Sequence, residues 1–237
     1  MTRELIEDFV PFFEHWKGLP HQIAAARQFW EAVPANLKKR DASWYETWEA
    51  AGKQETSRAI TNPIRAPFYS QRDSATAHAL RMCFSSSCAM LLEAVKPGTL
   101  TGPNGDDAYL GRVLRYGDTT DPMAQLKALG SYGIEATFTK HANWVTIEQQ
   151  IDKGIPVPLG FLHHGPASAP RGGGHWLCCI GYRSNALVVH DPFGEINLAA
   201  GGYLNNWGAR LSYSHKNFGP RWMVEGPGSG WAIIASL

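Results

Sequence analysis

The periodicity of the apolar residues changes along the chain, and this change constrains the fold more than any other feature. Near the amino terminus Phe9, Phe12, Phe13 and Trp16 recur every three or four residues, which is typical of one face of a helix. After Gly133 the apolar residues instead form short β-branched runs that are separated by turn residues. Helices first and strands later predict an α+β fold with a mainly antiparallel sheet.

The same pattern divides the chain into three parts. Residues 1–53 are expected to form a helical N-terminal module, in which Pro20 suits the first turn of a second helix. Residues 54–67 are polar and contain two prolines, so we expect a linker or a crossing loop there. Residues 68–237 would form the main domain. We expect the amphipathic module to pack against this domain, with docking on a partner or a membrane surface as the alternative.

Within the main domain, local signals indicate the individual elements. Asp121 and Pro122 are typical of a helix cap and first turn, and Thr146 is a second candidate cap. The expected helices cover residues 85–95, 109–116, 121–132 and 144–153. The expected strands cover residues 135–138, 156–162, 176–182 and 186–191, and residues 99–107 are expected to be a loop.

The composition excludes several classes of protein. A hydrophobic content of 44% and a charged content of 18% are ordinary for a folded protein, and a net charge of +1 gives no reason to expect nucleic-acid binding. Residues 1–8 contain acids where a signal peptide would need an apolar run, and no stretch approaches the ~20 apolar residues of a membrane span. We therefore expect synthesis in a cytoplasm without an export signal, so that action outside it would require delivery. The oligomeric state stays open.

The cysteines and histidines do not predict a metal site. None of Cys83, Cys88, Cys178 and Cys179 lies in a Cys-x-x-Cys pair, and adjacent strand residues point to opposite faces of a sheet. His163 and His164 are also adjacent, so on a strand their side chains would point to opposite faces and could not share a metal ion. The acids Asp106 and Asp107 lack the spaced oxygen ligands of a calcium loop. We expect no metal, no cofactor and no disulfide framework.

The candidate nucleophile is Cys83, which lies just before the small-residue segment Ser85-Ser86-Ser87 that opens an apolar helix. A cysteine at a helix N-terminus meets the positive end of the helix dipole, which favours the thiolate, and small residues after it let a substrate approach the backbone. A buried structural cysteine is the alternative. Cys88 lies within the same helix, away from its positive end, and is expected to pack in the core.

Two further residues could activate this thiol. His175 follows three glycines at the start of an apolar run, and these glycines would leave space for a substrate beside the imidazole. Asp191 ends a hydrophobic strand, where a buried carboxylate needs a partner, and a pair with His175 would orient the imidazole. The alternative for His175 is a core histidine whose hydrogen bonds are made within the fold, and the alternative for Asp191 is an aspartate that forms the turn before Pro192. Gln71, upstream of the cysteine, could donate an oxyanion hydrogen bond together with the Cys83 backbone N–H.

These residues occur in the order of a known family. Residues 68–195 resemble the C39-like branch of the papain-fold cysteine peptidases, which show Gln, then Cys before a helix, then Gly-His before an apolar strand, and later Asp-Pro. The resemblance implies a papain-like fold in which Cys83, His175, Asp191 and Gln71 are catalytic. One difference is Phe84-Ser85, where many members have Gly-Pro after the nucleophile.

The flanking segments suggest a substrate. The segment 16–22, which contains Leu-Pro-His-Gln, resembles a short helical module of phage-encoded cell-wall-lytic proteins, and residues 213–231 resemble the C-terminal segment of phage hydrolases of this type. These resemblances imply an endolysin-like enzyme that cleaves an amide bond in bacterial peptidoglycan, as an endopeptidase or an amidase. A peptidase that processes leader peptides or proteins, and a non-catalytic wall-binding module on the same scaffold, are the alternatives.

Tryptophans could contribute to binding this substrate. Flat aromatic faces pack against sugars and peptides, although most tryptophans are expected in the core. Trp176, next to His175, is the best candidate for the cleft, and Gly174 is expected beside it in the substrate site. The other candidates are Trp144, Trp207, Trp222 and Trp231.

Overall fold

The computed structural model describes residues 62–236. The predicted N-terminal helical module lies outside these residues, as does most of the predicted linker. The part of the linker that is described contacts the domain, because Ile64 is buried and its backbone N–H donates to the Ile180 carbonyl at 2.6 Å. Residues 62–67 therefore pack on the main domain and do not act as a free linker.

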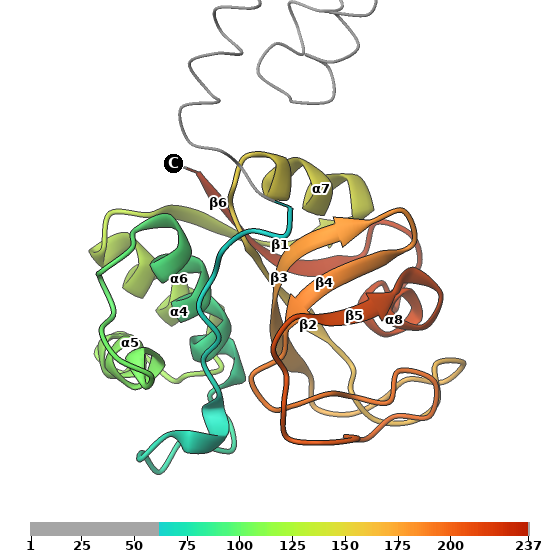
Figure 1. Cartoon of the computed structure of the whole chain (residues 1–237), viewed down its shortest axis with the longest axis horizontal. Helices are drawn as coiled ribbons and strands as arrows, with labels where there is room; N and C mark the ends of the chain where they lie inside the picture. The colour runs from blue at the N-terminus through green and yellow to red at the C-terminus, as the bar shows by residue number, and fades with distance from the viewer. Residues whose placement is uncertain (1–61, 237) are drawn as a thin grey trace, which may run out of the picture. The chain divides into compact units, whose positions relative to one another are not determined.

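The predicted α+β architecture is confirmed. Figure 1 shows α4, α5 and α6 grouped to one side of a twisted sheet whose strand order is β1-β6-β2-β3-β4-β5, with α7 and α8 lying apart from this group. Every neighbouring pair in this sheet is antiparallel. The strands are β1 (Glu135–Ala142), β2 (Val157–Phe161), β3 (His175–Arg183), β4 (Ala186–His190), β5 (Leu211–Ser214) and β6 (Gly230–Ser236).

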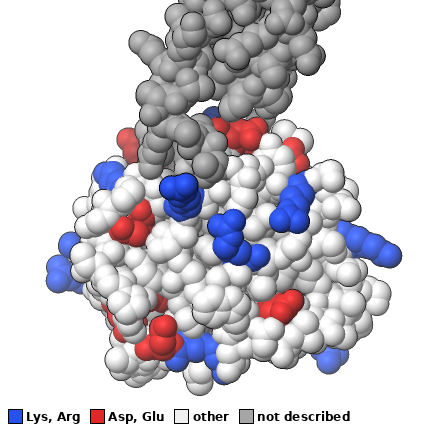
Figure 2. Space-filling view, in the orientation of Figure 1, with Lys and Arg blue, Asp and Glu red and all other residues white. Residues whose placement is uncertain are grey.

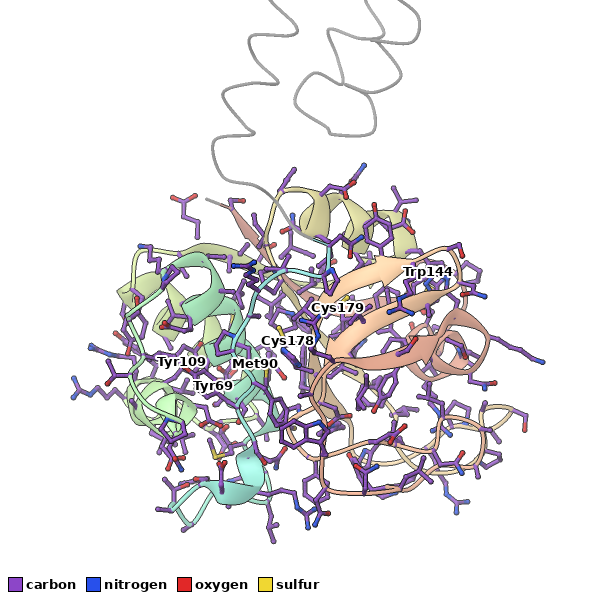
Figure 3. The ribbon with its side chains drawn as sticks, viewed as in Figure 1. Tyr69, Met90, Tyr109, Trp144, Cys178 and Cys179 are labelled. Carbon is purple, nitrogen blue, oxygen red and sulfur yellow. The ribbon has the colours of Figure 1, made fainter. Side chains whose placement is uncertain are left out.

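Two layers of helices cover the sheet. The helices are α4 (Cys83–Val95), α5 (Gly105–Val113), α6 (Pro122–Ser131), α7 (Trp144–Asp152) and α8 (His215–Trp222), and a short 3-10 helix, η1, covers Gln71–Asp73. One core cluster joins α4, α5 and α6 to one sheet face, and a second joins α7 and α8 to the other. Cys178 belongs to the first cluster and Cys179 to the second, so these neighbours point to opposite faces as predicted (Figure 3).

Most predicted elements are present, with shifted ends. Asp121 caps α6 by accepting a hydrogen bond from the Met123 backbone N–H. Helix α7 is capped by Asn143, and Thr146 completes a capping box with it. The expected loop at residues 99–107 is wrong in its last part, because α5 begins at Gly105. Its first turn is buried, where Asp106 accepts a hydrogen bond from Ser86 Oγ on α4.

Helix α4 is almost completely enclosed between the sheet and the other two helices of its layer. Its three serines are buried, and each has a hydrogen-bond partner. The Ser87 hydroxyl donates to the Cys83 carbonyl at 2.8 Å, within the first turn. Because buried polar groups are costly unless they are paired, these bonds fix the helix in one position and hold Cys83 at its start.

Charges are mixed on the face that Figure 2 shows, where Lys and Arg side chains are interspersed with Asp and Glu. Among residues 62–236, no helix is both long and apolar enough to cross a membrane.

One buried cation holds the connection after β2 in place. Arg221 on α8 is fully buried and donates hydrogen bonds to the carbonyl oxygens of Leu162, His164, Gly165 and Leu198 at 2.5–3.3 Å. No carboxylate pairs with Arg221 in the described part of the chain. The His164 carbonyl also accepts from the Arg171 backbone N–H, whereas Arg221 supplies the donors for the carbonyl oxygens of Leu162, Gly165 and Leu198.

We predict that Arg221→Met destabilises the protein by about 3 kcal/mol, because it leaves buried carbonyl oxygens without donors. The free energy of unfolding in urea, followed by tryptophan fluorescence on the full chain, measures this loss. Arg183→Met is the matched control, since Arg183 is exposed at the end of β3. Equal stability of the two variants would contradict the assigned role of Arg221.

Candidate active site

A cleft of about 760 Å³ opens between the α4 side of the domain and the sheet. It brings together Gln71, Cys83 and His175 with the predicted substrate-binding residues Gly174 and Trp176. Asp191 lies behind His175 and is completely buried. The structure therefore gathers all the sequence-predicted site residues at one place, from elements that are far apart in the sequence.

Cys83 is the first residue of α4, and its side chain is partly exposed at the cleft. The helix was predicted to begin at residue 85, but α4 begins two residues earlier, at Cys83. The thiol therefore lies directly at the positive end of the helix dipole. Cys88, Cys178 and Cys179 are fully buried, and burial raises the pKa of the Cys179 thiol to about 12. Among the described cysteines, Cys83 alone reaches the cleft.

His175 begins β3 and points its imidazole into the space between Cys83 and Asp191. Its Nε2 lies 2.6 Å from Asp191 Oδ1. With Nε2 engaged in this way, Nδ1 is the ring nitrogen left for the thiol. Burial by itself lowers the pKa of His175, but the charges of Asp191 and Cys83 and the hydrogen bonds with both residues raise it to about 10. The surroundings thus favour the imidazolium form of His175.

Asp191 follows β4 and is held by three donors. Besides His175, its Oδ1 accepts from the Phe193 backbone N–H at 3.1 Å, and its Oδ2 accepts from the Tyr213 hydroxyl at 3.2 Å. Its backbone lies against Gly208, where an added Cβ would be 1.8 Å from the Asp191 carbonyl oxygen. A buried carboxylate that is bonded in this way is pre-oriented toward the imidazole.

Aromatic rings surround the imidazole of His175. Phe161, Phe193 and Tyr203 approach it edge to face with ring centroids at 5.4–6.3 Å. His163 lies on a further side at 5.6 Å. Burial, followed by the charges of His175 and His164, lowers the pKa of His163 to about 4, so this ring is neutral at pH 7. These rings limit the access of water to the His175–Asp191 pair and so strengthen its electrostatic attraction.

Gln71 is buried at the start of η1 and lines the cleft beside Cys83. Its backbone N–H donates to the Pro192 carbonyl, which ties η1 to the segment that follows Asp191. Its side-chain amide donates to the Ala79 carbonyl at 2.8 Å. Because an amide nitrogen carries two hydrogens, one donor remains for an oxyanion in the cleft.

The residues that flank His175 shape the neighbouring surface. Gly174 has a φ of +83°, a conformation that glycine adopts readily, and the space beside its Cα is open. Trp176 is half-buried and stacks on Phe84, with ring centroids 3.6 Å apart and an interplanar angle of 3°. Phe84, which stands in place of the family's glycine after the cysteine, thus supports a cleft residue.

The other histidines and acids that the sequence singled out have different environments. His190 is buried, and its Nδ1 accepts a hydrogen bond from the Arg210 backbone N–H. His163 and His164 lie with their rings 3.9 Å apart. Within residues 62–236 no group of three His, Cys, Asp or Glu side chains is arranged to hold a metal ion. Asp106 is buried beneath α4, and burial raises its pKa to about 6.

Tyr213 and the rings around His175 are site residues that local sequence patterns do not indicate. Tyr213 is in the C-terminal segment that was noted only for its resemblance, and nothing in its immediate sequence indicates contact with Asp191. Tyr203 and Phe193 lie in the long irregular connection between β4 and β5, where no periodic pattern predicts which side chains turn inward. The pairing of β4 with β5 brings Tyr213 close to Asp191. A single sequence carries no direct signal for this strand pairing.

Comparison with known proteins identifies related sequences. The sequence profile described as the peptidase C39-like family matches residues 63–214. No curated protein matches the chain.

Three solved structures that resemble this chain are the following. The peptidase domain of Streptococcus ComA, a bi-functional ABC transporter of a quorum sensing pathway, has a TM-score of 0.46 and 16% identity, over 73% of this chain and 98% of that one. A candidate C39-like peptidase from Bacillus anthracis has a TM-score of 0.49 and 13% identity, over 73% and 96%. A double glycine motif protease of an AMS/PCAT transporter, solved with its leader peptide, has a TM-score of 0.43 and 18% identity, over 73% and 93%.

We predict that iodoacetamide at neutral pH alkylates the native protein at Cys83 before any other described cysteine, because only this thiol combines access with an imidazolium neighbour. Peptide mass mapping identifies the labelled residue. His175→Ala is expected to slow the labelling by about tenfold or more, since it removes the positive charge beside the thiolate.

His141→Ala is the matched control, because His141 is exposed on β1 and outside the cleft. First labelling of Cys88, Cys178 or Cys179, or an unchanged rate in His175→Ala, would show that the thiol is not activated as the geometry indicates.

Proposed function

The chain belongs to the peptidase C39-like family, and we propose that it is a cysteine hydrolase that cleaves an amide bond in bacterial peptidoglycan. The observation that carries the chemistry is the arrangement of Cys83 at the cleft with the His175–Asp191 pair behind it. The family assignment supports a cysteine peptidase, and the finer assignment of the substrate rests on the residues that line the cleft.

In the proposed reaction the Cys83 thiolate attacks the carbonyl carbon of the scissile amide. Gln71 Nε2 and the Cys83 backbone N–H stabilise the negative oxygen. His175 then donates a proton to the leaving nitrogen, the C–N bond breaks, and a thioester to Cys83 remains. Neutral His175 next accepts a proton from water, whose oxygen attacks the thioester and releases the thiolate.

Asp191 serves this cycle without changing its own charge. The hydrogen bond to Nε2 fixes the ring so that Nδ1 faces the thiol, and the carboxylate stabilises the imidazolium whenever it forms. Tyr213 and the Phe193 backbone N–H hold the carboxylate for this purpose, so we assign them as positioning groups.

The choice of peptidoglycan is supported by the C-terminal segment. Residues 213–231 resemble the corresponding part of phage hydrolases, and this segment forms one wall of the cleft. Its members in the wall are Arg221, Trp222, Val224, Glu225, Ser229 and Trp231. Arg221 and Trp222 are buried, whereas Val224, Glu225, Ser229 and Trp231 are at least partly exposed. Part of the resemblance therefore falls on residues that could contact the substrate.

A peptidase that processes leader peptides would use the same catalytic residues. The distinction between the two functions lies in the substrate alone, so that an assay on cell walls separates them.

We predict that the full chain clears a suspension of purified peptidoglycan and that Cys83→Ala reduces the rate by about a thousandfold or more, because the nucleophile is lost. The decrease in turbidity measures this activity. Cys88→Ala is the matched control, since it makes the same substitution in the same helix at a buried position.

Clearing by Cys83→Ala at the original rate would refute the assigned nucleophile. Failure of the active protein to clear any wall preparation, together with cleavage of an extended peptide, would favour the processing peptidase instead.

A further inference from the structure

Tyr203 presents a hydroxyl group at the cleft to which the proposed reaction assigns no role. The residue lies in the connection between β4 and β5, and it lines the cleft together with Cys83 and His175. In the part of the chain that the structure describes, this hydroxyl makes no hydrogen bond, and its oxygen is not completely buried. A ligand in the cleft can therefore reach the hydroxyl and form a hydrogen bond with it.

The backbone on both sides of Tyr203 is held in place. The preceding residue, Gly202, donates its N–H to the His163 carbonyl at 3.3 Å. The following residue, Leu204, donates its N–H to the Glu195 carbonyl at 2.7 Å. A side chain on such a fixed segment is positioned before a ligand binds, so little conformational entropy is lost when the ligand contacts it.

The ring of Tyr203 packs on residues around the catalytic pair. Its centroid lies 4.6 Å from that of Phe193 and 5.9 Å from that of the His175 imidazole, which it meets at an interplanar angle of 86°. These contacts are made by the ring, so a phenylalanine at this position would keep them. The contribution of the hydroxyl group can therefore be separated from that of the packing.

The surroundings of Tyr203 keep its hydroxyl protonated. Burial, followed by the negative charges of Asp191 and Cys83, raises the pKa of Tyr203 above its ordinary value of 10. The phenol is therefore neutral at pH 7 and has a proton to donate. A general base is excluded as its role at this pH, and a hydrogen-bond donor to the substrate is the role that remains.

The scissile carbonyl oxygen does not need this donor. In the proposed reaction it already accepts hydrogen bonds from Gln71 and from the Cys83 backbone N–H, and a carbonyl oxygen has two lone pairs. The Tyr203 hydroxyl is therefore left for a different acceptor. In a peptide substrate the acceptors nearest to the scissile amide are the carbonyl oxygens of the amides beside it.

Resting on the cysteine-hydrolase chemistry of the proposed function, we propose that Tyr203 binds the substrate by donating a hydrogen bond to an amide carbonyl next to the scissile bond. The stem peptides of peptidoglycan and the chains of proteins both carry such carbonyls, so this contact holds the substrate main chain without selecting a side chain. Tyr203 is accordingly a substrate-binding residue, whereas Tyr213 acts through Asp191.

Two small aldehydes of equal length test this contact on the full chain. N-acetylglycinal carries an amide beside its aldehyde group, and pentanal has two methylene groups in place of this amide. Each aldehyde adds reversibly to the thiol, because Cys83 Sγ bonds to the aldehyde carbon and the aldehyde oxygen takes the proton that His175 holds. The thiol is then blocked, so the decrease in the rate of Cys83 alkylation by iodoacetamide with rising aldehyde concentration gives each Kd.

We expect Tyr203→Phe to weaken the binding of N-acetylglycinal about three- to tenfold, as the loss of one neutral hydrogen bond would, and to leave the Kd of pentanal unchanged. Without aldehyde, the alkylation rate of Cys83 should equal that of the unsubstituted protein, because the thiol and the imidazole keep their surroundings. Tyr116→Phe is the matched control, since Tyr116 is 39% exposed and outside the cleft, and it should change neither Kd.

Four results would overturn the proposal. The first is an unchanged Kd of N-acetylglycinal in Tyr203→Phe, and the second is no protection of Cys83 by N-acetylglycinal in the unsubstituted protein. The third is an equal loss of affinity for both aldehydes, which would place the donor at the reacting oxygen. The fourth is a changed alkylation rate without aldehyde, which would show that the hydroxyl acts on the thiol.

The clearing of purified peptidoglycan by the unsubstituted protein separates this inference from the proposed function. If the walls are cleared and Tyr203→Phe binds both aldehydes as the unsubstituted protein does, the role of Tyr203 alone is wrong. If the walls are not cleared and Tyr203→Phe loses affinity for N-acetylglycinal alone, the choice of peptidoglycan fails while the role of Tyr203 stands.

Discussion

The site depends on one buried hydrogen-bonded pair, His175 Nε2 and Asp191 Oδ1, at 2.6 Å. A carboxylate with no exposed surface is costly, and it is tolerated here because three donors converge on it. The adjacent strands β3 and β4 bring the two residues together, and the ordered sheet keeps them there. Once the pair is fixed, the imidazole has one free nitrogen, and the start of α4 places a thiol beside it.

The two halves of the domain contribute different parts of the chemistry. The helical side supplies the nucleophile through α4, whose buried serines prevent the helix from shifting. The sheet supplies the acid–base pair, while the aromatic rings around His175 keep water away from it. The C-terminal residues 221–231 then close one side of the cleft. Substrate choice can therefore vary in that wall without a change in the catalytic residues.

Local signals in the sequence predicted the order of the elements and the principal site residues. Cysteine before small residues and an apolar helix, and histidine after glycines at the start of a strand, are patterns within about ten residues, so they can be read directly. Helix α8 and strands β5 and β6 were not predicted. Gly219 and Pro220 disfavour a helix, and α8 forms because Phe218 and Trp222 pack into the core. Contacts such as Tyr213 with Asp191 depend on sheet pairing, which a single sequence does not specify.

The protonation state of His175 tests the central claim most directly. Desolvation opposes an imidazolium there, yet Asp191 and Cys83 raise the pKa to about 10, above the ordinary value of 6.5. Side-chain ¹⁵N NMR of the full chain between pH 7 and 9 should therefore show both ring nitrogens of His175 protonated, with the proton lost as the pH rises toward 10. In Asp191→Asn the loss should occur at lower pH, because the negative charge beside Nε2 is gone. A His175 ring that is neutral at pH 7 in the unchanged protein would contradict the thiolate–imidazolium pair on which the proposed chemistry rests.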